Sequence, residues 1–222
     1  METSKQPHLC DMHRSRRRRR FLLTAALLAV LAGFCALTLY VVYRPMKPQA
    51  SVLRAAVFQL ANAAGNNRTF SSSPPYALAA CVQFTLLLHN PSDRAALLYD
   101  GLLAYVAYRG EPVTPPEILP SLVQERGADV ALSPLLGGGG VPVPVSADAV
   151  GALAADCAAR RVQLRLVVMG RVRYRTGPFR SWWRDLYVRC DVTLGIDVPV
   201  PAGGAGIGNV PLLEYPECFV DA

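Results

Sequence analysis

The chain has 222 residues, which is enough for one ordinary domain with appendages. With 52% hydrophobic and only 18% charged residues, it is apolar for a soluble protein, so a membrane segment is sought first. The net charge of +7 is concentrated in residues 1–20, where seven basic and two acidic side chains leave +5. A nucleic-acid-binding domain needs a basic patch on its folded part, so this distribution excludes nucleic acid as an expected partner.

Residues 1–20 form a basic tail, and residues 21–43 are predicted to form a transmembrane helix. Phe21 to Tyr43 is 23 residues without a charged side chain. As a helix it would span about 34 Å, against a hydrocarbon core of about 30 Å. Five consecutive arginines at the bilayer centre would together cost roughly 12–18 kcal/mol, so the tail is expected to stay cytosolic and the rest to be extracellular. These topology residues are Arg16, Arg17, Arg18, Arg19 and Arg20.

Two other interpretations of the apolar stretch remain open. A cleaved signal peptide also begins basic and then apolar, but its apolar core typically has about 7–15 residues. A buried helix of a soluble protein would leave the adjoining arginine run unexplained. Cys10 in the tail is either an unmodified thiol or a palmitoylation site.

Residues 44–50 read as a short stiff stalk, because Pro45 and Pro48 resist helix continuation. Residues 51–197 show period-2 patterns typical of strands, and the short strands separated by turn signals predict an all-β sandwich. The clearest strand is Val162 to Arg175, which alternates apolar and arginine positions, with Val167 and Met169 as exceptions. Further strands are predicted at Val52–Leu60, Leu78–His89, Leu102–Arg109, Asp129–Leu132, Val141–Val145 and Leu186–Leu194. One helix is predicted at Ala147–Ala159, with Ser146 as its N-cap, and residues 198–222 form a Gly/Pro-rich C-terminal segment.

Four cysteines follow the predicted span, which leaves several disulfide connectivities open. The preferred pair is Cys190 with Cys218, which would close the C-terminal segment and stabilise the fold by roughly 3.5 kcal/mol. The alternative is that Cys190 is a small buried core residue. Asn67 begins an Asn-Arg-Thr glycosylation sequon in a polar stretch.

Catalytic and metal-binding patterns find no support. His89 is the only histidine beyond the predicted span, and it precedes an Asn-Pro turn. HExxH and GxSxG motifs are missing, as is any Cys/His cluster at metal-ligand spacing. The glycine run 137–140 lacks the GK[ST] ending of a phosphate-binding loop. Catalytic, metal-ligating and cofactor-binding residues are therefore all predicted to be none, and the protein is not expected to be an enzyme.

Two ordered signatures carry a resemblance to a known family. Phe84 to Thr114 contains Asn90-Pro91-Ser92 after a strand, then Leu98-Tyr99, then a strand ending in Tyr-Arg. Gly170 to Gly177 resembles a Gly-x-Val-Arg-Trp-x-x-Gly segment with Tyr174 at the tryptophan position, and Val188-Arg189-Cys190 resembles the strand that follows it. With Leu132-Ser133-Pro134, the basic tail and the single span, the chain resembles the plant NHL proteins (nonrace-specific disease resistance and harpin-induced-like), within the group-two late embryogenesis abundant superfamily.

The resemblance implies an immunoglobulin- or fibronectin-III-like sandwich, a plasma-membrane location, in some relatives at plasmodesmata, and a role in pathogen defence or stress responses. It supplies no catalytic residues. The departures at Leu98 and Tyr174 bear on any function tied to those aromatic positions.

The expected function is that of a non-enzymatic, membrane-anchored interaction protein whose partners are the bilayer and proteins in homo- or hetero-oligomers. Arginine and tryptophan are favoured at interface hot spots, so a recognition surface is a candidate. Its residues are Arg165, Arg171, Arg173, Arg175, Trp182 and Trp183. The alternative for these side chains is a solvated strand face with a tryptophan pair covering one end of the core. Competing functions are a lipid-binding or membrane-bridging module, a dehydration-protective protein and a hydrolase or transferase.

Overall fold

The computed structural model describes residues 9–42, 46–62, 76–195, 207–213 and 218–222. The chain divides into two compact units, Met1–Arg44 and Pro45–Ala222. The first unit holds one helix, α1 (Leu9–Val42). Within α1, the 21 residues Arg18–Thr38 are long and apolar enough to cross a membrane, and none of them is buried. A signal sequence near an N-terminus can also meet these criteria of length and hydropathy.

Helix α1 is longer than the predicted span, because it begins at Leu9 and includes the arginine run. Arginine is a good helix former, so nothing in the run ends the helix where its hydrophobicity ends. The apolar side chains of Arg18–Thr38 are exposed; Phe21, for example, is 73% exposed and Val30 is 70% exposed. Such a surface is stable only when lipid or another apolar partner covers it.

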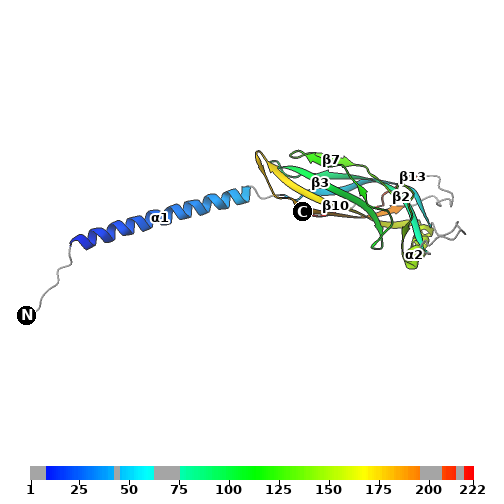
Figure 1. Ribbon diagram of the computed structural model, residues 1–222, viewed down its shortest axis with the longest axis horizontal. Coiled ribbons are helices and arrows are strands. Elements are labelled where there is room, and N and C mark those ends of the chain that lie inside the picture. The colour runs from blue at the N-terminus through cyan, green and yellow to red at the C-terminus, as the bar shows by residue number, and fades with distance from the viewer. Residues whose placement is uncertain (1–8, 43–45, 63–75, 196–206, 214–217) are drawn as a thin grey trace, which may run out of the picture. The chain divides into compact units, whose positions relative to one another are not determined.

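The second unit consists of two antiparallel sheets and one helix (Figure 1). In the first sheet, β1 (Gln49–Asn62) lies between β13 (Ile207–Val210) and β2 (Ala77–His89). Strand β2 also pairs with β7 (Asp129–Leu132), β8 (Leu135–Leu136) and β9 (Val143–Pro144).

The second sheet runs in the order β14 (Phe219–Asp221), β12 (Arg184–Gly195), β10 (Arg161–Thr176), β3 (Ala96–Tyr108), β4 (Glu111–Pro112). Strand β11 (Phe179–Arg180) pairs with β10. Strands β5 (Glu117–Ile118) and β6 (Leu122–Gln124) pair with β3.

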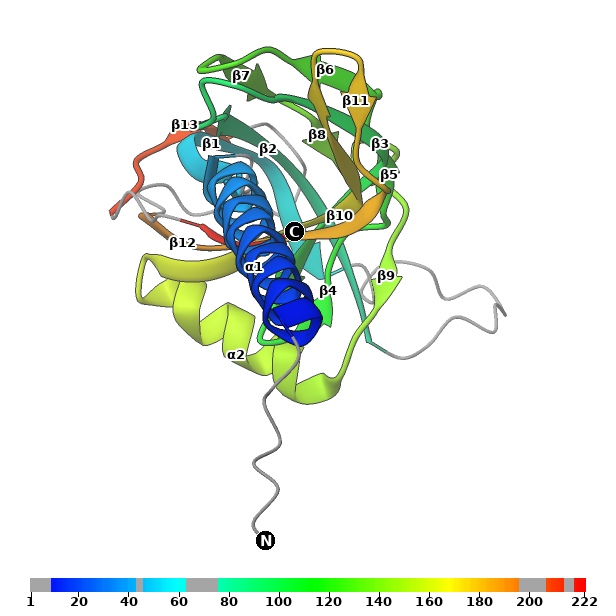
Figure 2. The same cartoon turned by 90° about the vertical axis from the view of Figure 1, so that its left-hand side faces the viewer.

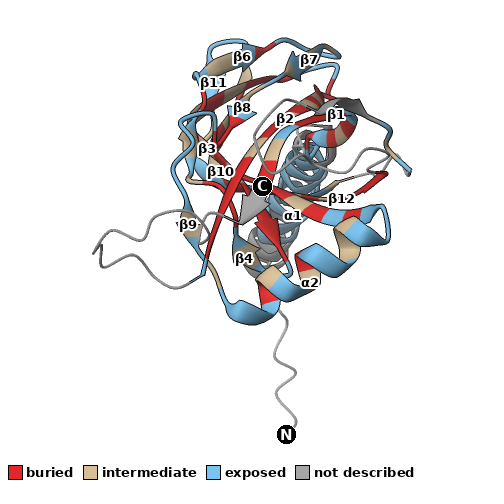
Figure 3. Cartoon of the chain, turned by 90° about the vertical axis from the view of Figure 1, so that its right-hand side faces the viewer, coloured by how far each residue is buried: buried red, intermediate tan, exposed pale blue. Residues whose placement is uncertain are grey.

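One hydrophobic core fills the space between the sheets (Figure 3). The inward residues of the long strands are almost completely buried, as the predicted alternation requires. The largest fully buried side chains include Phe84, Tyr99, Tyr108, Leu102, Leu164, Leu166 and Leu194. The prediction of an all-β sandwich after one helix is therefore confirmed, while the immunoglobulin or fibronectin-III label stays a prediction.

Helix α2 (Ala147–Ala158) packs Ala149 and Leu153 against the core. Its predicted N-cap is present: the hydroxyl of Ser146 accepts a hydrogen bond from the backbone N–H of Ala149 at 3.1 Å. The same hydroxyl donates to the carboxylate of Glu111 at 2.6 Å, so the start of the helix is fixed to β4. This contact also lowers the pKa of Glu111.

Two of the predicted strands differ most from the structure. Strand β3 begins at Ala96, six residues before the expected Leu102, because the Asp100-Gly101 step is a bulge within the strand and not its beginning. The strand expected at Val141–Val145 shrinks to Val143–Pro144, since its two prolines cannot donate ladder hydrogen bonds. The other two- and three-residue strands were not predicted, because such lengths show no periodicity.

The sandwich does not end at residue 197, where the sequence placed its boundary. The C-terminal segment contributes β13 to the first sheet and β14 to the second. Leu194 also forms an isolated bridge with Leu212. The Gly/Pro-rich composition concealed two short edge strands that need long-range partners to form.

Candidate interaction surface

The outward arginines of β10 bind carboxylates of neighbouring segments. Arg165 Nε donates to Asp191 on β12 at 2.6 Å. Arg171 lies 3.1 Å from Asp100 on β3. Arg175 similarly lies 3.3 Å from Glu125, which follows β6. These three arginines therefore hold adjacent strands together, and little of their charge remains free for a partner.

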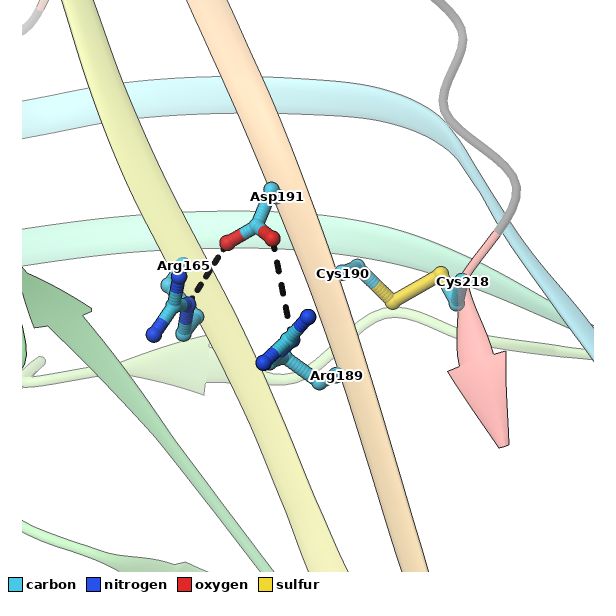
Figure 4. Close-up of a disulfide and its surroundings, with 5 residues drawn as sticks. All are labelled: Arg165, Arg189, Cys190, Asp191 and Cys218. Carbon is cyan, nitrogen blue, oxygen red and sulfur yellow. Dashed lines mark hydrogen bonds and ion pairs between the residues drawn. A yellow bond between two sulfur atoms is a disulfide. The ribbon is translucent and has the colours of Figure 1, made fainter. Parts of the chain in front are cut away.

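Asp191 lies between two guanidinium groups on the outer face of the second sheet (Figure 4). Arg189 Nε is 3.6 Å from its second oxygen. The hydrogen bond to Asp191 raises the pKa of Arg165. Both pairs are partly solvent-exposed, so each contributes at most about 1 kcal/mol to stability.

The preceding residue, Cys190, points to the opposite face and is fully buried. It forms a disulfide with Cys218, across a sequence separation of 28 residues. The bond fastens the last strand, β14, to β12, as Figure 4 shows. The sequence left two interpretations of Cys190, a disulfide with Cys218 or a small buried core residue. Both describe it, because Cys190 lies in the core and is bonded to Cys218.

The two tryptophans have different surroundings. The guanidinium carbon of Arg173 lies 4.4 Å from the ring centroid of Trp183, and that of Arg171 lies 5.7 Å away. Trp183 is therefore held against the sheet by two cations. Trp182 has no such cover and is 92% exposed. The six residues of the candidate surface thus separate into five that the fold occupies and one, Trp182, that it leaves free.

An apolar row crosses the outer face of the second sheet, and the sequence did not reveal it. Met169 on β10 is paired with Tyr187 on β12 and with Leu103 on β3, which in turn is paired with Ile118. Paired residues project to the same face of a sheet. Ile118 is 81% exposed. In the sequence of Val162–Arg175, Met169 is only an exception to the alternation. The strand register that assembles the row is not visible in any one segment.

A polar cavity of about 330 Å³ opens beside the end of β3. It is lined by Tyr108, Asp156, Arg165 and Asp191, among others. The Tyr108 hydroxyl donates to Asp156 at 2.6 Å, and burial together with that hydrogen bond raises the pKa of Tyr108 to about 12. A tyrosine with this pKa remains a neutral hydrogen-bond donor at physiological pH, so the cavity offers hydrogen bonds and not an activated nucleophile.

Two residues of the family signatures, Asn90 and Tyr99, have a structural role. Asn90 is fully buried, and its amide donates to the carbonyls of Ala95 and Glu125 at 2.9 and 3.0 Å. The Tyr99 hydroxyl donates to the side chain of Gln124 at 2.9 Å. Gln124 in turn donates to two backbone carbonyls. These buried polar groups fix the loops between β2, β3 and β7.

Other residues singled out from the sequence lie apart from this surface. His89 ends β2, with Nδ1 2.6 Å from Asp129. Among the described residues, no group of three or more His, Cys, Asp or Glu side chains could hold a metal ion. Asn67 lies outside the described residues, and so do the side chains of Cys10, Arg16 and Arg17. Three further residues of the arginine run, Arg18, Arg19 and Arg20, are exposed on α1.

Comparison with known proteins finds three relatives that are all named NDR1/HIN1-like proteins. NDR1/HIN1-like protein 12 of Arabidopsis thaliana is 27% identical over 200 residues, covering 86% of this chain and 89% of the relative. NDR1/HIN1-like protein 1 of the same plant is 28% identical over 188 residues, covering 82% of this chain and 83% of the relative. NDR1/HIN1-like protein 26 is 27% identical and covers 73% of this chain and 72% of the relative.

No family model matches the chain. A solved structure of a protein from Archaeoglobus fulgidus aligns with 61% of this chain and 94% of that chain at 10% identity, but its TM-score of 0.29 is too low to support any argument. The three Arabidopsis relatives, each aligned over most of both chains, confirm the resemblance that the ordered signatures indicated: over most of its length this chain is similar to NDR1/HIN1-like proteins.

Proposed function

We propose that this protein is a single-pass plasma-membrane protein with a cytosolic N-terminus, whose extracellular β-sandwich acts as a non-enzymatic interaction component in plant defence or stress responses. The observation that carries the proposal is the order of three features along the chain. An arginine run adjoins an unburied apolar helix, and a disulfide-bonded β domain follows. A soluble protein has no use for this arrangement, whereas an anchored extracellular domain needs all three.

The disulfide supports the orientation independently of the charges. Disulfides persist in oxidising compartments and are rare in the cytosol. The pair Cys190–Cys218 joins strands of one fold and is enclosed by it, since Cys190 is fully buried. A β domain on the extracellular side is consistent with both the arginines at one end of the span and the cystine beyond the other.

A role in binding is favoured by how the polar side chains are used. The arginines of β10 hold carboxylates or an aromatic ring of the same domain. The residues of the family signatures hold loops together through buried hydrogen bonds. What the domain offers to a partner is consequently an exposed surface with aromatic and apolar side chains, the type found at protein interfaces.

The experiment is protease protection of sealed microsomes with an epitope tag at each end of the full chain. The proposal requires the C-terminal tag and the β domain to be protected and the N-terminal tag to be cleaved. A variant with Arg16–Arg20 replaced by glutamate is the matched control, because it keeps the apolar helix and removes the charge asymmetry; a mixture of orientations is expected. Protection of the N-terminal tag in the natural sequence would refute the topology, and unchanged pathogen responses in plants lacking the protein would refute the role.

Separate measurements test the modifications and partners that the topology permits. Occupancy of Asn67 predicts a loss of mass after deglycosylation, which Asn67→Gln abolishes. Acylation of Cys10 predicts hydroxylamine-sensitive label that Cys10→Ala removes. Homo- or hetero-oligomers predict cross-linked species in plant plasma membranes, and fluorescent fusions would show whether the protein gathers at plasmodesmata.

The second candidate function is a lipid-binding or membrane-bridging module. A lipid chain inside the sandwich receives no support, because described core residues such as Phe84, Leu166 and Val192 fill the space between the sheets. What favours contact with lipid is instead the exposed aromatic pair Phe179 and Trp182, which are 77% and 92% exposed.

A further inference from the structure

The segment between β10 and β12, Gly177–Trp183, carries the most exposed aromatic side chains of the described β domain; it is termed the hairpin tip. Phe179 is 77% exposed and Trp182 is 92% exposed. Tryptophan is highly buried on average in folded proteins. Two neighbouring aromatic side chains held in water therefore need an explanation.

The hairpin tip is a rigid structure. Gly177 adopts φ +58 in the turn that follows β10. The turn reverses the chain, so that Phe179 of β11 pairs with Thr176 of β10. The backbone N–H of Ser181 donates to the backbone carbonyl of Tyr174 at 2.8 Å. The side-chain hydroxyl of Ser181 accepts a hydrogen bond from the backbone N–H of Tyr174 at 2.9 Å. The aromatic side chains are thus presented on a fixed support, which reduces the entropic cost of binding.

The register of the sheets places the hairpin tip at the end of the sandwich where the domain begins. Gln49, the first residue of β1, is paired with His89 at the end of β2. The short loop after His89 leads to Ala96, which starts β3 and is paired with Arg175 near the end of β10. Figure 2 shows β11 close to β6, whose following residue Glu125 binds Arg175. The start of β1 and the hairpin tip therefore share one end of the domain.

Electrostatics agree with this placement. The pKa of Tyr174 is raised by burial, and the positive charges of Arg184 and Lys47 partly offset the shift. Lys47 also lines a cavity with His89, at the end of β2, and with Val220 of β14, which places it at the end of the domain where β1 begins. Lys47 is also fixed by a 2.8 Å ion pair with Asp221 of β14.

The length of the connection limits how far this end can be from the membrane. Six residues separate Val42, the end of α1, from Gln49, the start of β1. An extended chain advances at most about 3.6 Å per residue, so the connection reaches no further than roughly 25 Å. That distance is smaller than the thickness of the bilayer's hydrocarbon core, about 30 Å.

Building on the proposed membrane anchoring, we propose that the hairpin tip inserts Phe179 and Trp182 into the headgroup region of the bilayer that α1 spans. Tryptophan rings favour this interface because one edge is polar and the rest is apolar. Arg180 between them is exposed and has no ion pair among the described residues, so its guanidinium is available for lipid phosphates. The insertion gives the domain a second attachment and fixes the direction in which its apolar row faces.

The composition of the chain provides a direct test, because its two tryptophans are Trp182 and Trp183. The full chain is reconstituted, one copy per nanodisc, in phosphatidylcholine with or without a spin label near the headgroup. In Trp183→Phe, emission comes from Trp182 alone; in Trp182→Phe, the matched control, it comes from the covered Trp183. We expect headgroup spin labels to quench Trp182 strongly, and its emission to be blue-shifted, while Trp183 is quenched much less.

Further outcomes separate the inference from the anchoring on which it rests. Replacement of Phe179 by serine in the Trp183→Phe background should reduce the quenching of Trp182, because one of the two inserted aromatic side chains is lost. A chain that does not remain with the nanodiscs on gel filtration refutes the anchoring itself. A chain that remains, but whose Trp182 is quenched no more than Trp183 or emits as in water, refutes the insertion alone. A Trp182 that is shielded from aqueous quencher but not quenched by lipid indicates a protein contact and also overturns the inference.

Discussion

Replacement of Asn90 by alanine tests the claim that the family signature is structural. The side chain of Asn90 is fully buried and makes three hydrogen bonds. Its amide donates to the carbonyls of Ala95 and Glu125, and its Oδ1 accepts from the backbone N–H of Ser92 at 3.1 Å. Alanine keeps none of these interactions.

The expected loss of stability follows from these bonds. At about 1 kcal/mol for each intramolecular hydrogen bond, three bonds give about 3 kcal/mol. The carbonyl of Glu125 keeps a bond from the N–H of Ala128, so it is not left without a partner. The Ser92 N–H and the Ala95 carbonyl lose the Asn90 side chain as partner, and burial without one adds to the cost. We therefore expect Asn90→Ala to lower the free energy of unfolding by about 3–4 kcal/mol.

The assay is urea unfolding of the full chain in detergent micelles, followed by tryptophan fluorescence. Because both tryptophans lie in the β domain, the signal reports its unfolding and not that of α1. With a slope of about 2 kcal/mol per molar urea, the midpoint should fall by roughly 1.5–2 M. Asp93→Ala in the same loop is the control: Asp93 is exposed, and its removal should change stability by less than about 0.5 kcal/mol.

Asn90→Asp sharpens the test. The carboxylate keeps an acceptor for Ser92 but meets two carbonyl oxygens where the amide donated, so burial and repulsion raise its pKa in the folded state. A raised folded pKa means that stability is highest at low pH and is lost as pH rises through that value. Asn90→Asp should thus unfold more easily at pH 7 than at pH 5. An Asn90→Ala variant as stable as Asp93→Ala would show that the signature does not hold the loop.

Three further predictions follow from single interactions. Removing the disulfide with the double variant Cys190→Ala, Cys218→Ala should cost about 3.5 kcal/mol of unfolding free energy, the loop-closure value for its 28-residue separation, and reduction should destabilise the parent protein but not the variant. Gly137→Ala should destabilise the domain strongly, because φ is +75 there and a Cβ would lie 2.0 Å from a backbone carbonyl oxygen of β2. Gly151→Ala is the contrasting variant: it lies inside α2 with nothing within 4 Å of its Cβ, so it should stabilise the domain by up to about 1 kcal/mol in thermal unfolding. Because the pKa of Tyr108 is raised to about 12 from an unfolded value near 10, its contribution to stability is complete below pH 10 and is lost as pH rises toward 12, so Tyr108→Phe should flatten the fall of unfolding free energy over this range; an equally steep fall in the variant would contradict the assignment.

The sequence by itself determined the features that depend on neighbouring residues. Uncharged length predicts a helix that can span lipid, period-2 alternation predicts the long strands, and the N-cap of α2 is set by Ser146 within one helical turn. Val162–Arg175 was nearly correct in both boundaries because its alternation lasts through the whole strand. The family resemblance was visible in short ordered signatures, and two of their residues, Asn90 and Tyr99, form buried hydrogen bonds.

Only the tertiary structure decided which surface is free. The candidate arginines looked alike in the sequence. Whether each one forms an ion pair within the domain depends on whether the sheet register places a carboxylate opposite, as Asp191 lies opposite Arg165. Pairing between distant strands likewise assembled the apolar row and brought Trp182 to the end of the β domain where β1 begins. The physical reason is that hydrogen-bond register and side-chain contact between segments far apart in sequence are set by the whole packed core, and no local pattern records them.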